Sequence, residues 1–378
     1  MLSSRWAVPA GVGFAFGSGD GLDAETTGGM PGTPPMPAGG RSLVESEPTV
    51  NGSWVNPVAE IFGAIEIGTR SYVAGNTILY AADGRMVSLG DENNVQDNVY
   101  VLARDADVRF ADSVSLAHHA IVENSTIGAF TFFGFRSRVR NAVVEAGAMV
   151  MHGATVEGVT IRRNTITPIG ATIVRQEEAD ALPTLDEASG QFKHQVQAVN
   201  LEFVEGYSRL YRDRGRSPLE GVGPNPITSW NPVYVDPQIG ADTTLAEFVR
   251  IVGDVRLGEE SAVGQRTAMR ADEGTPIVIG RRARIQSRTT FHALKGTRID
   301  LGENAQVGAD NVIHGPVAIG DNFASEDGVI VFRATVENNV TIRQGAIVAG
   351  RVVIREGAIV PERAVVTTQE EADALPRG

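Results

Sequence analysis

The chain has 378 residues, of which 42% are apolar, so it is long enough for two domains and able to bury a core. Its formal net charge of −13 and the lack of a long basic run argue against a nucleic-acid partner or an anionic membrane surface. Because the sequence has no cysteine, disulfides, thiolate metal sites and cysteine nucleophiles are excluded, and a metal would need histidine or carboxylate ligands.

Residues 1–49 form a leader rich in glycine, proline, serine and threonine, which we expect to be flexible. Within it, the short apolar stretch 6–16 resembles the core of an export signal, although a proline and glycines interrupt it. The sequence favours the cytoplasm, and export is the alternative if residues 1–20 are such a signal. No stretch reaches the roughly 18 apolar residues that a membrane-spanning helix needs.

Two copies of one pattern follow the leader. The segment QEEADALP occurs at 176–183 and again at 369–376, an identity that indicates duplication rather than chance. We expect the first copy to occupy residues 50–189 and the second to occupy residues 225–378, each as a domain of its own.

Aliphatic residues recur every six positions within the copies. The second copy has the run Ile330, Val336, Ile342, Val348, Ile354, Val360 and Val366, and the first has the shorter runs Ile121, Ile127, Phe133, Val139 and Val144, Val150, Val156. A period of six fits neither a plain strand nor a helix. It predicts a solenoid whose coil has three flat sides, each with one aliphatic side chain pointing inward. The predicted fold class is therefore all-β, with two parallel β-helix (hexapeptide-repeat) domains.

Residues 190–213 carry a different pattern, with apolar side chains at helical spacing. We expect an α-helix after the first β-helix, packed on the outside of that domain. Residues 214–224 then read as a linker to the second copy.

The sequence has six histidines, which are His118, His119, His152, His194, His292 and His314. Two of them, His292 and His314, lie about one coil apart, and each follows a residue that would point inward. Both should therefore emerge side by side on one outer face. Two imidazoles are too few for catalytic zinc, which commonly has three protein ligands and an open position for water.

Longer motifs carry a family resemblance. The second copy resembles γ-class carbonic anhydrases in NPITSWNP (225–232), YVDPQIGA (234–241), MRADEGTPIVIG (269–280), FHALKG (291–296) and IHGPVAIGDN (313–322). The first copy resembles the same family in GDENNVQDNV (90–99), SLAHHAIV (115–122), AVNLEFVEGY (198–207) and QEEADALP. The resemblance implies left-handed β-helices, hydration of CO2 to bicarbonate, and a metal between neighbouring β-helices.

The resemblance also implies that the ligands are divided between the copies. The second copy supplies the histidines of the HAL and HGP motifs but has Ala309 at the SLAH position, whereas the first supplies the SLAH histidine but has Leu102 and Glu123 at the other two positions. Each copy thus lacks what the other brings. The predicted metal ligands are His118, His292 and His314.

The register at the SLAH motif leaves one alternative open. If FRSRVRN (135–141) corresponds to FRATVEN (332–338), the first copy is shorter by one hexapeptide after His118, and His119 could face outward instead. His152 and His194 match no ligand of the family, and we expect both to be exposed.

Further side chains acquire roles from the resemblance. Glu273 matches a proton-transfer glutamate, and Gln286 matches the glutamine that would orient the metal-bound hydroxide. Lys295 stands where the family has a second shuttle glutamate, which leaves the proton path open. Interface and supporting roles fall on Arg270, Asp272, Asn200, Gln96 and Asp97.

Three neutral imidazoles on a divalent ion bring the pKa of bound water to about 7, so that hydroxide can attack CO2. Zinc is the expected metal, and Fe(II) or Co(II) also suits such ligands. The alternatives are a non-catalytic β-helical scaffold or assembly subunit from the same family, and an acyltransferase. The resemblance implies a homo-oligomer formed through β-helix faces, and it leaves open whether the site lies within or between chains.

Overall fold

The computed structural model describes residues 41–42 and 48–378. The predicted flexible leader falls mainly on residues 1–40 and 43–47, which lie outside the described residues. In the described chain, most strands pair with the strands that lie three places before and three places after them in the chain. Each coil thus contributes one strand to each of three sheets. This pattern occurs twice, and the chain forms two left-handed parallel β-helices, as predicted.

The first β-helix has three sheets. Sheet 1 contains β1 (Arg41–Ser42), β4 (Glu60–Phe62), β7 (Ile78–Ala81), β10 (Tyr100–Ala103), β13 (Ile121–Glu123), β16 (Arg138–Arg140), β19 (Thr155–Glu157) and β21 (Thr172–Ile173). Sheet 2 contains β5 (Ala64–Ile67), β8 (Met86–Leu89), β11 (Val108–Phe110), β14 (Thr126–Ile127), β17 (Val143–Val144) and β20 (Thr160–Ile161). Sheet 3 contains β2 (Thr49–Val50), β3 (Ser53–Val55), β6 (Tyr72–Val73), β9 (Asn94–Val95), β12 (Ser115–Leu116), β15 (Phe132–Phe133) and β18 (Met149–Val150).

The second β-helix repeats the arrangement. Sheet 4 contains β22 (Val222–Gly223), β25 (Arg250–Gly253), β28 (Ala268–Ala271), β31 (Thr290–Ala293), β34 (Val312–Gly315), β37 (Ile330–Phe332), β40 (Ile347–Ala349) and β43 (Val365–Val366). Sheet 5 contains β23 (Gln238–Ile239), β26 (Val255–Leu257), β29 (Ile277–Ile279), β32 (Ile299–Leu301), β35 (Val317–Ile319), β38 (Thr335–Val336) and β41 (Val353–Ile354). Sheet 6 contains β24 (Thr244–Leu245), β27 (Ala262–Val263), β30 (Arg284–Ile285), β33 (Gln306–Val307), β36 (Ala324–Ser325), β39 (Thr341–Ile342) and β42 (Ile359–Val360).

The core of each β-helix is a column of stacked aliphatic side chains. In sheet 1, Leu79, Val101, Val122, Val139 and Val156 pair in register from coil to coil, and each is fully buried. Full burial of such a side chain contributes roughly 1.5–3 kcal/mol. Because the same position recurs in every coil, the column holds successive coils in one register.

The six-residue period places the inward residues correctly except where a coil is shortened. Val331, not Ile330, pairs with Val348 and enters the core, while Ile330 faces outward. The two valines are 17 residues apart, one fewer than three hexapeptides, so counting by sixes lands on the wrong neighbour. The first copy shows the same shift by one residue, since Val122 points into the core and Ile121 points outward.

The duplicated QEEADALP segment closes the last coil of each β-helix. It forms α1 (Gln176–Asp180) in the first copy and α4 (Gln369–Asp373) in the second. Ala179 and Leu182 join the core of the first β-helix, and Ala372 joins that of the second. The repeated sequence therefore covers apolar side chains that the end of a solenoid would expose.

The helix predicted after the first β-helix is α2 (Glu187–Arg214). Asp186 caps its start by accepting a hydrogen bond from the N–H of Ser189. Its apolar side packs on the first β-helix, where the rings of Tyr207 and Trp54 stack with centroids 5.5 Å apart. The short helix α3 (Ser217–Glu220) follows. Where one domain ends and the next begins stays a prediction.

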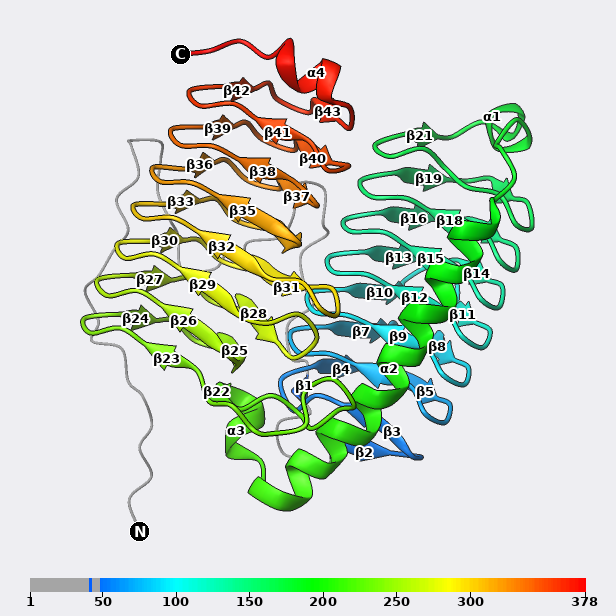
Figure 1. Ribbon diagram of the computed structural model, residues 1–378. Helices are drawn as coiled ribbons and strands as arrows, with labels where there is room; N and C mark the ends of the chain where they lie inside the picture. Colours follow the sequence, from blue (N-terminus) through cyan, green and yellow to red (C-terminus); the bar gives the residue numbers. More distant parts are fainter. Residues whose placement is uncertain (1–40, 43–47) are drawn as a thin grey trace.

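The two β-helices stand side by side with their last coils at the same end, and α2 runs along the first of them (Figure 1). Their junction is made by turns that follow sheet 3. Asn76, Asn98 and Arg136, all with positive φ, donate side-chain hydrogen bonds to the second β-helix. Asparagine tolerates this backbone conformation better than most residues. Among the described residues, no helix combines the length and apolar character needed to cross a membrane.

Candidate metal centre

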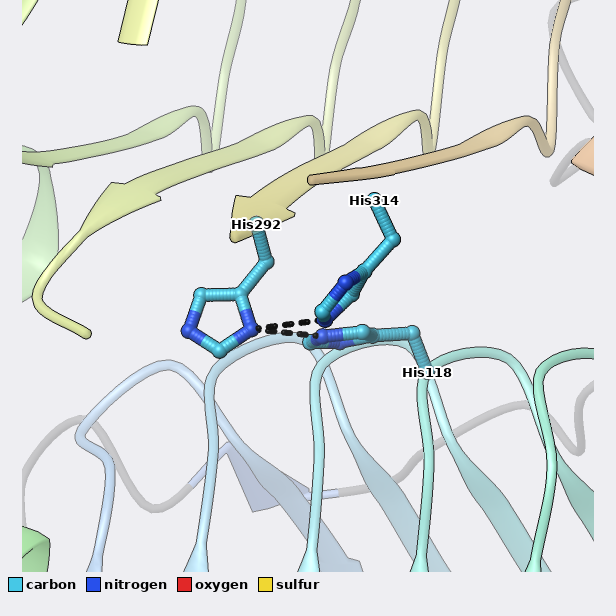
Figure 2. A group of neighbouring side chains, drawn as sticks. All are labelled: His118, His292 and His314. Atoms are coloured by element: carbon cyan, nitrogen blue, oxygen red, sulfur yellow. Dashed lines mark hydrogen bonds between the residues drawn. The ribbon is translucent and has the colours of Figure 1, made fainter. Parts of the chain in front are cut away.

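Two rows of side chains meet at the junction between the β-helices. On the outer face of sheet 4, His292 in β31 and His314 in β34 occupy paired positions. In the first β-helix, His118 lies in the turn after β12. Figure 2 shows the two histidines of the second β-helix reaching toward His118 of the first. We call these three residues the histidine cluster.

Two of the three nitrogen–nitrogen distances within the histidine cluster match those of a tetrahedral metal site. Nδ1 of His292 lies 3.2 Å from Nε2 of His118 and 3.2 Å from Nε2 of His314. All three ligand atoms lie within 4.8 Å of one another, and the residues are at most 4% exposed. Tetrahedral zinc with Zn–N bonds of 2.0–2.1 Å separates two ligand nitrogens by about 3.3 Å.

A carboxylate lies beside one nitrogen of each of two histidine rings and favours the proton there. Nδ1 of His118 lies 3.4 Å from Oδ2 of Asp97, and Nε2 of His292 lies 3.1 Å from Oδ1 of Asp272. A carboxylate oxygen accepts hydrogen bonds, so it favours an N–H on the nitrogen that faces it. The lone pairs of both rings therefore lie on the nitrogens that face each other.

His314 completes the same arrangement. Its Nδ1 lies 3.2 Å from the backbone carbonyl oxygen of Gly315, which leaves the lone pair on Nε2. Burial lowers the pKa of His118 to about 4 and lowers that of His314 well below its usual value, so both rings are neutral at neutral pH. Three lone pairs thus converge in a buried space, and a divalent cation fits this donor set.

Arg270 links the two β-helices beside the histidine cluster. Its guanidinium lies 3.1 Å from Oδ2 of Asp97 in the first β-helix and 3.3 Å from Oδ2 of Asp272 in the second. It also donates to Oε1 of Gln96 and to the hydroxyl of Tyr72. Although burial opposes ionisation, Arg270 holds the pKa of both aspartates below its usual value.

Glu273 lies beside the histidine cluster and is 8% exposed. Its Oε2 is 3.8 Å from Nε2 of His292, and its Oε1 accepts the backbone N–H of Lys295. Burial raises the pKa of Glu273, which brings its titration closer to neutral pH. A carboxyl group with that property can exchange protons under ordinary conditions.

A cavity of about 620 Å³ opens over the histidine cluster between the two β-helices and α2. Apolar side chains, among them Phe135, Phe332 and Val196, form much of its wall. Asn200 reaches it from α2 and accepts a hydrogen bond from Nε2 of Gln96. Asn200, Gln96 and Glu273, all singled out from the sequence, therefore share the cavity with the histidine cluster.

Gln286 is not brought to the histidine cluster. It is exposed in the turn after β30 and lines a separate surface pocket with Gln306 and Glu326. The cluster combines a turn of the first β-helix with sheet 4 of the second. The glutamine that reaches it is consequently Gln96, which occupies the corresponding turn of the first copy.

The expected exposure of His152 is also wrong. This residue is 5% exposed, stacks on Phe135 with ring centroids 4.5 Å apart, and lines the cavity. His118, Phe135 and His152 follow one another at 17-residue intervals, the length of these coils. That spacing was the signal that could have placed His152 in the row of His118. His194 is exposed on α2, as expected.

The register at His118 is resolved by the backbone. The backbone N–H of Arg136 donates to the carbonyl oxygen of His118, and the N–H of Gly328 donates to the carbonyl oxygen of Ala309. The coil that follows His118 is therefore shorter than the coil that follows Ala309 by one residue, not by a hexapeptide. Nε2 of His119 lies 3.0 Å from Oγ1 of Thr290, away from the histidine cluster. Hence His118, not His119, joins the cluster.

Comparison with known proteins yields relatives for part of the chain. A carbonic anhydrase of Methanosarcina thermophila is 30% identical over 181 residues, which cover 42% of this chain and 71% of that protein. The chain belongs to the γ-class carbonic anhydrase family. No protein-family model matches it.

Another relative of this γ-class member is a carboxysome assembly protein, CcmM, of a Nostoc species. It is 32% identical over 186 residues, which cover 46% of this chain and 33% of that protein. The chain thus spans about a third of the length of this relative. A hexapeptide transferase family protein from Anaplasma phagocytophilum, a solved structure, covers 40% of this chain and 89% of that one at 22% identity and a TM-score of 0.30.

Proposed function

We propose that this protein is a metal-dependent carbonic anhydrase that interconverts CO2 and bicarbonate at one site built from both β-helices. The observation that carries the proposal is the histidine cluster, in which three buried imidazole nitrogens direct lone pairs toward a common point. The carbonic anhydrase among the relatives supports the reaction.

His118, His292 and His314 would hold the metal, with zinc expected and Fe(II) or Co(II) as alternatives. A divalent ion bound there would lower the pKa of a coordinated water and make hydroxide available near neutral pH. Asp97 and Asp272 keep two of the rings in the tautomer that ligation requires.

Glu273 would accept the proton that hydration of CO2 releases. It lies in the same cavity, and burial raises its pKa. Lys295 replaces the second shuttle glutamate of the family and holds Glu273 through its backbone N–H. Proton transfer would then depend on Glu273 and on buffer that enters the open cavity.

The remaining walls would suit the substrate. CO2 is small and apolar, and Phe135, Phe332 and Val196 offer it an apolar surface. Gln96 and Asn200 add amide groups that could orient a polar product. Their own hydrogen bonds hold these amides in place.

A second candidate is a non-catalytic assembly role. It is favoured by the CcmM relative, which is described as a carboxysome assembly protein. The first β-helix fits such a role, because Leu102 and Glu123 occupy in sheet 1 the paired positions that histidines occupy in sheet 4. In that case the histidine cluster could bind metal without turnover.

Metal analysis and CO2 hydration assays of matched variants separate these possibilities. The wild-type protein should hold about one equivalent of divalent metal per chain and hydrate CO2. His118→Ala and His292→Ala should each lose the metal and the activity. His194→Ala is the control, because this histidine is exposed on α2 and should leave both unchanged.

The outcomes lead to different conclusions. Unchanged metal content in His118→Ala would refute a site shared between the β-helices. Metal bound at full occupancy without measurable hydration would refute the anhydrase and favour the assembly role. Loss of both properties in His118→Ala and His292→Ala, with His194→Ala intact, would support the proposal.

A further inference from the structure

One end of the cavity has a polar lining that hydration of CO2 does not use. His152 lies there, in the turn after β18, and the ring of Phe332 contacts it with centroids 5.4 Å apart. The guanidinium carbon of Arg333 lies 4.9 Å from the centroid of the same Phe332 ring. Arg351, one coil farther along, also lines this end.

His152 presents a hydrogen-bond donor to this space. Its Nδ1 accepts the backbone N–H of Phe135 at 3.0 Å, so this nitrogen carries a lone pair and the ring proton is on Nε2. Among the described residues, no acceptor is hydrogen-bonded to Nε2. The side chain is 5% exposed and lines the cavity, so this donor is available to a ligand that enters there.

The two arginines carry positive charge without an acidic partner among the described residues. Other arginines of the second β-helix pair with carboxylates, such as Arg343 with Glu326 at 2.6 Å and Arg355 with Glu337 at 3.2 Å. Arg333 and Arg351 form no such pair with any carboxylate of the described residues.

The electrostatics of Arg333 agree with an uncompensated charge. Burial, together with repulsion from Arg351, lowers the pKa of Arg333. The two carboxylates of the cavity wall are engaged elsewhere, since Glu202 accepts hydrogen bonds from Ser229 and Glu273 accepts one from Lys295. An anion placed between the guanidinium groups would relieve their repulsion.

We propose that this end of the cavity is a binding subsite for a small oxyanion, held by the Nε2–H of His152 and by the guanidinium groups of Arg333 and Arg351. A guanidinium offers paired N–H donors that match the oxygens of a planar oxyanion. Bicarbonate belongs to this class and, on the proposed function, would be the product that leaves through the subsite. The subsite itself requires no metal.

The test follows the ring resonances of His152 by NMR while sodium bicarbonate replaces sodium chloride at constant ionic strength. Assignment comes from His152→Asn, which removes the signal. The titration uses the full chain in five forms, which are the wild type, His292→Ala, the double variant Arg333→Gln/Arg351→Gln, Arg333→Lys, and the control Arg355→Gln. The His292→Ala form breaks the histidine cluster, so the result does not depend on metal binding or turnover.

We expect a saturable shift of the His152 resonances in the wild type, in His292→Ala and in Arg355→Gln. In the double variant, loss of the charge-assisted hydrogen bonds should raise the dissociation constant roughly 10–100-fold. Arg333→Lys, which keeps the charge, should retain part of the binding.

Three results would overturn the subsite. One is the absence of a saturable shift in the wild type. Another is equal affinity in the double variant and in Arg355→Gln. The third is loss of the shift in His292→Ala, because the anion would then sit at the histidine cluster.

Discussion

Replacing Arg270 by methionine should destabilise the junction of the two β-helices more than any exposed charge substitution. Arg270 is 2% exposed and lies within 3.3 Å of carboxylate oxygens of both Asp97 and Asp272. Methionine keeps much of the volume but leaves two buried carboxylates without their cation. Removing one member of a buried ion pair costs about 3–5 kcal/mol. We expect a loss of that size in the free energy of unfolding, measured by urea titration.

The reason for the loss is tested by a double-mutant cycle. In Arg270→Met/Asp97→Asn one uncompensated charge is removed again, so the double variant should be more stable than the sum of the single effects by roughly 0.5–3 kcal/mol. Arg343→Met, an exposed arginine paired with Glu326, is the control and should change the midpoint little. A loss below about 1 kcal/mol in Arg270→Met, or strict additivity in the cycle, would refute the reasoning.

Other predictions concern the cavity, the core and the response to acid. Gln96→Ala should lower kcat for CO2 hydration roughly 10–100-fold, because the side chain of Gln96 is hydrogen-bonded to Arg270 and Asn200. Gln286→Ala, at an exposed residue, should leave kcat unchanged. Equal losses of kcat in the two variants, measured by stopped flow, would contradict the assignment of Gln96 rather than Gln286 to the site. Phe291→Ala should lower the free energy of unfolding by about 3–5 kcal/mol, since its side chain is fully buried beside His292, and a urea midpoint close to wild type would argue against that packing. Acid should weaken the fold, because Asp97 and Asp272 have folded pKa values below their unfolded ones. Their stabilisation is complete above about pH 4 and is lost as the pH falls through the folded values. Urea midpoints that stay constant from neutral pH down through that range would exclude this linkage.

The solenoid could be predicted from sequence because each side of every coil needs one inward aliphatic side chain, and such residues therefore recur every six positions. The period fails where a coil loses one residue, as between Val331 and Val348, since the loss shifts the phase without changing composition. Nothing in a run of aliphatic residues shows where such a shortening falls. The core was therefore predictable as a pattern, and its phase was not.

The candidate site was predictable only where a motif lies on a strand or turn whose outward-facing positions follow from the repeat. His292 and His314 pair in register because both occupy the third position of their strands. Gln286 and Gln96 occupy equivalent turns, and only the docking of the two copies decides which turn meets sheet 4. His152 was missed because its placement depends on coil length rather than on any motif.

The junction places His118 and His292 on a single polypeptide. Groups joined by a chain meet at a local concentration set by the connecting segment, here α2 and the residues after it, and dilution does not change that concentration. A substitution in one half also changes only one side of this junction, whereas in a homo-oligomer of identical subunits it would change both sides. Each half can thus accumulate changes that its counterpart would not tolerate, as Ala309 in one half and Leu102 in the other illustrate.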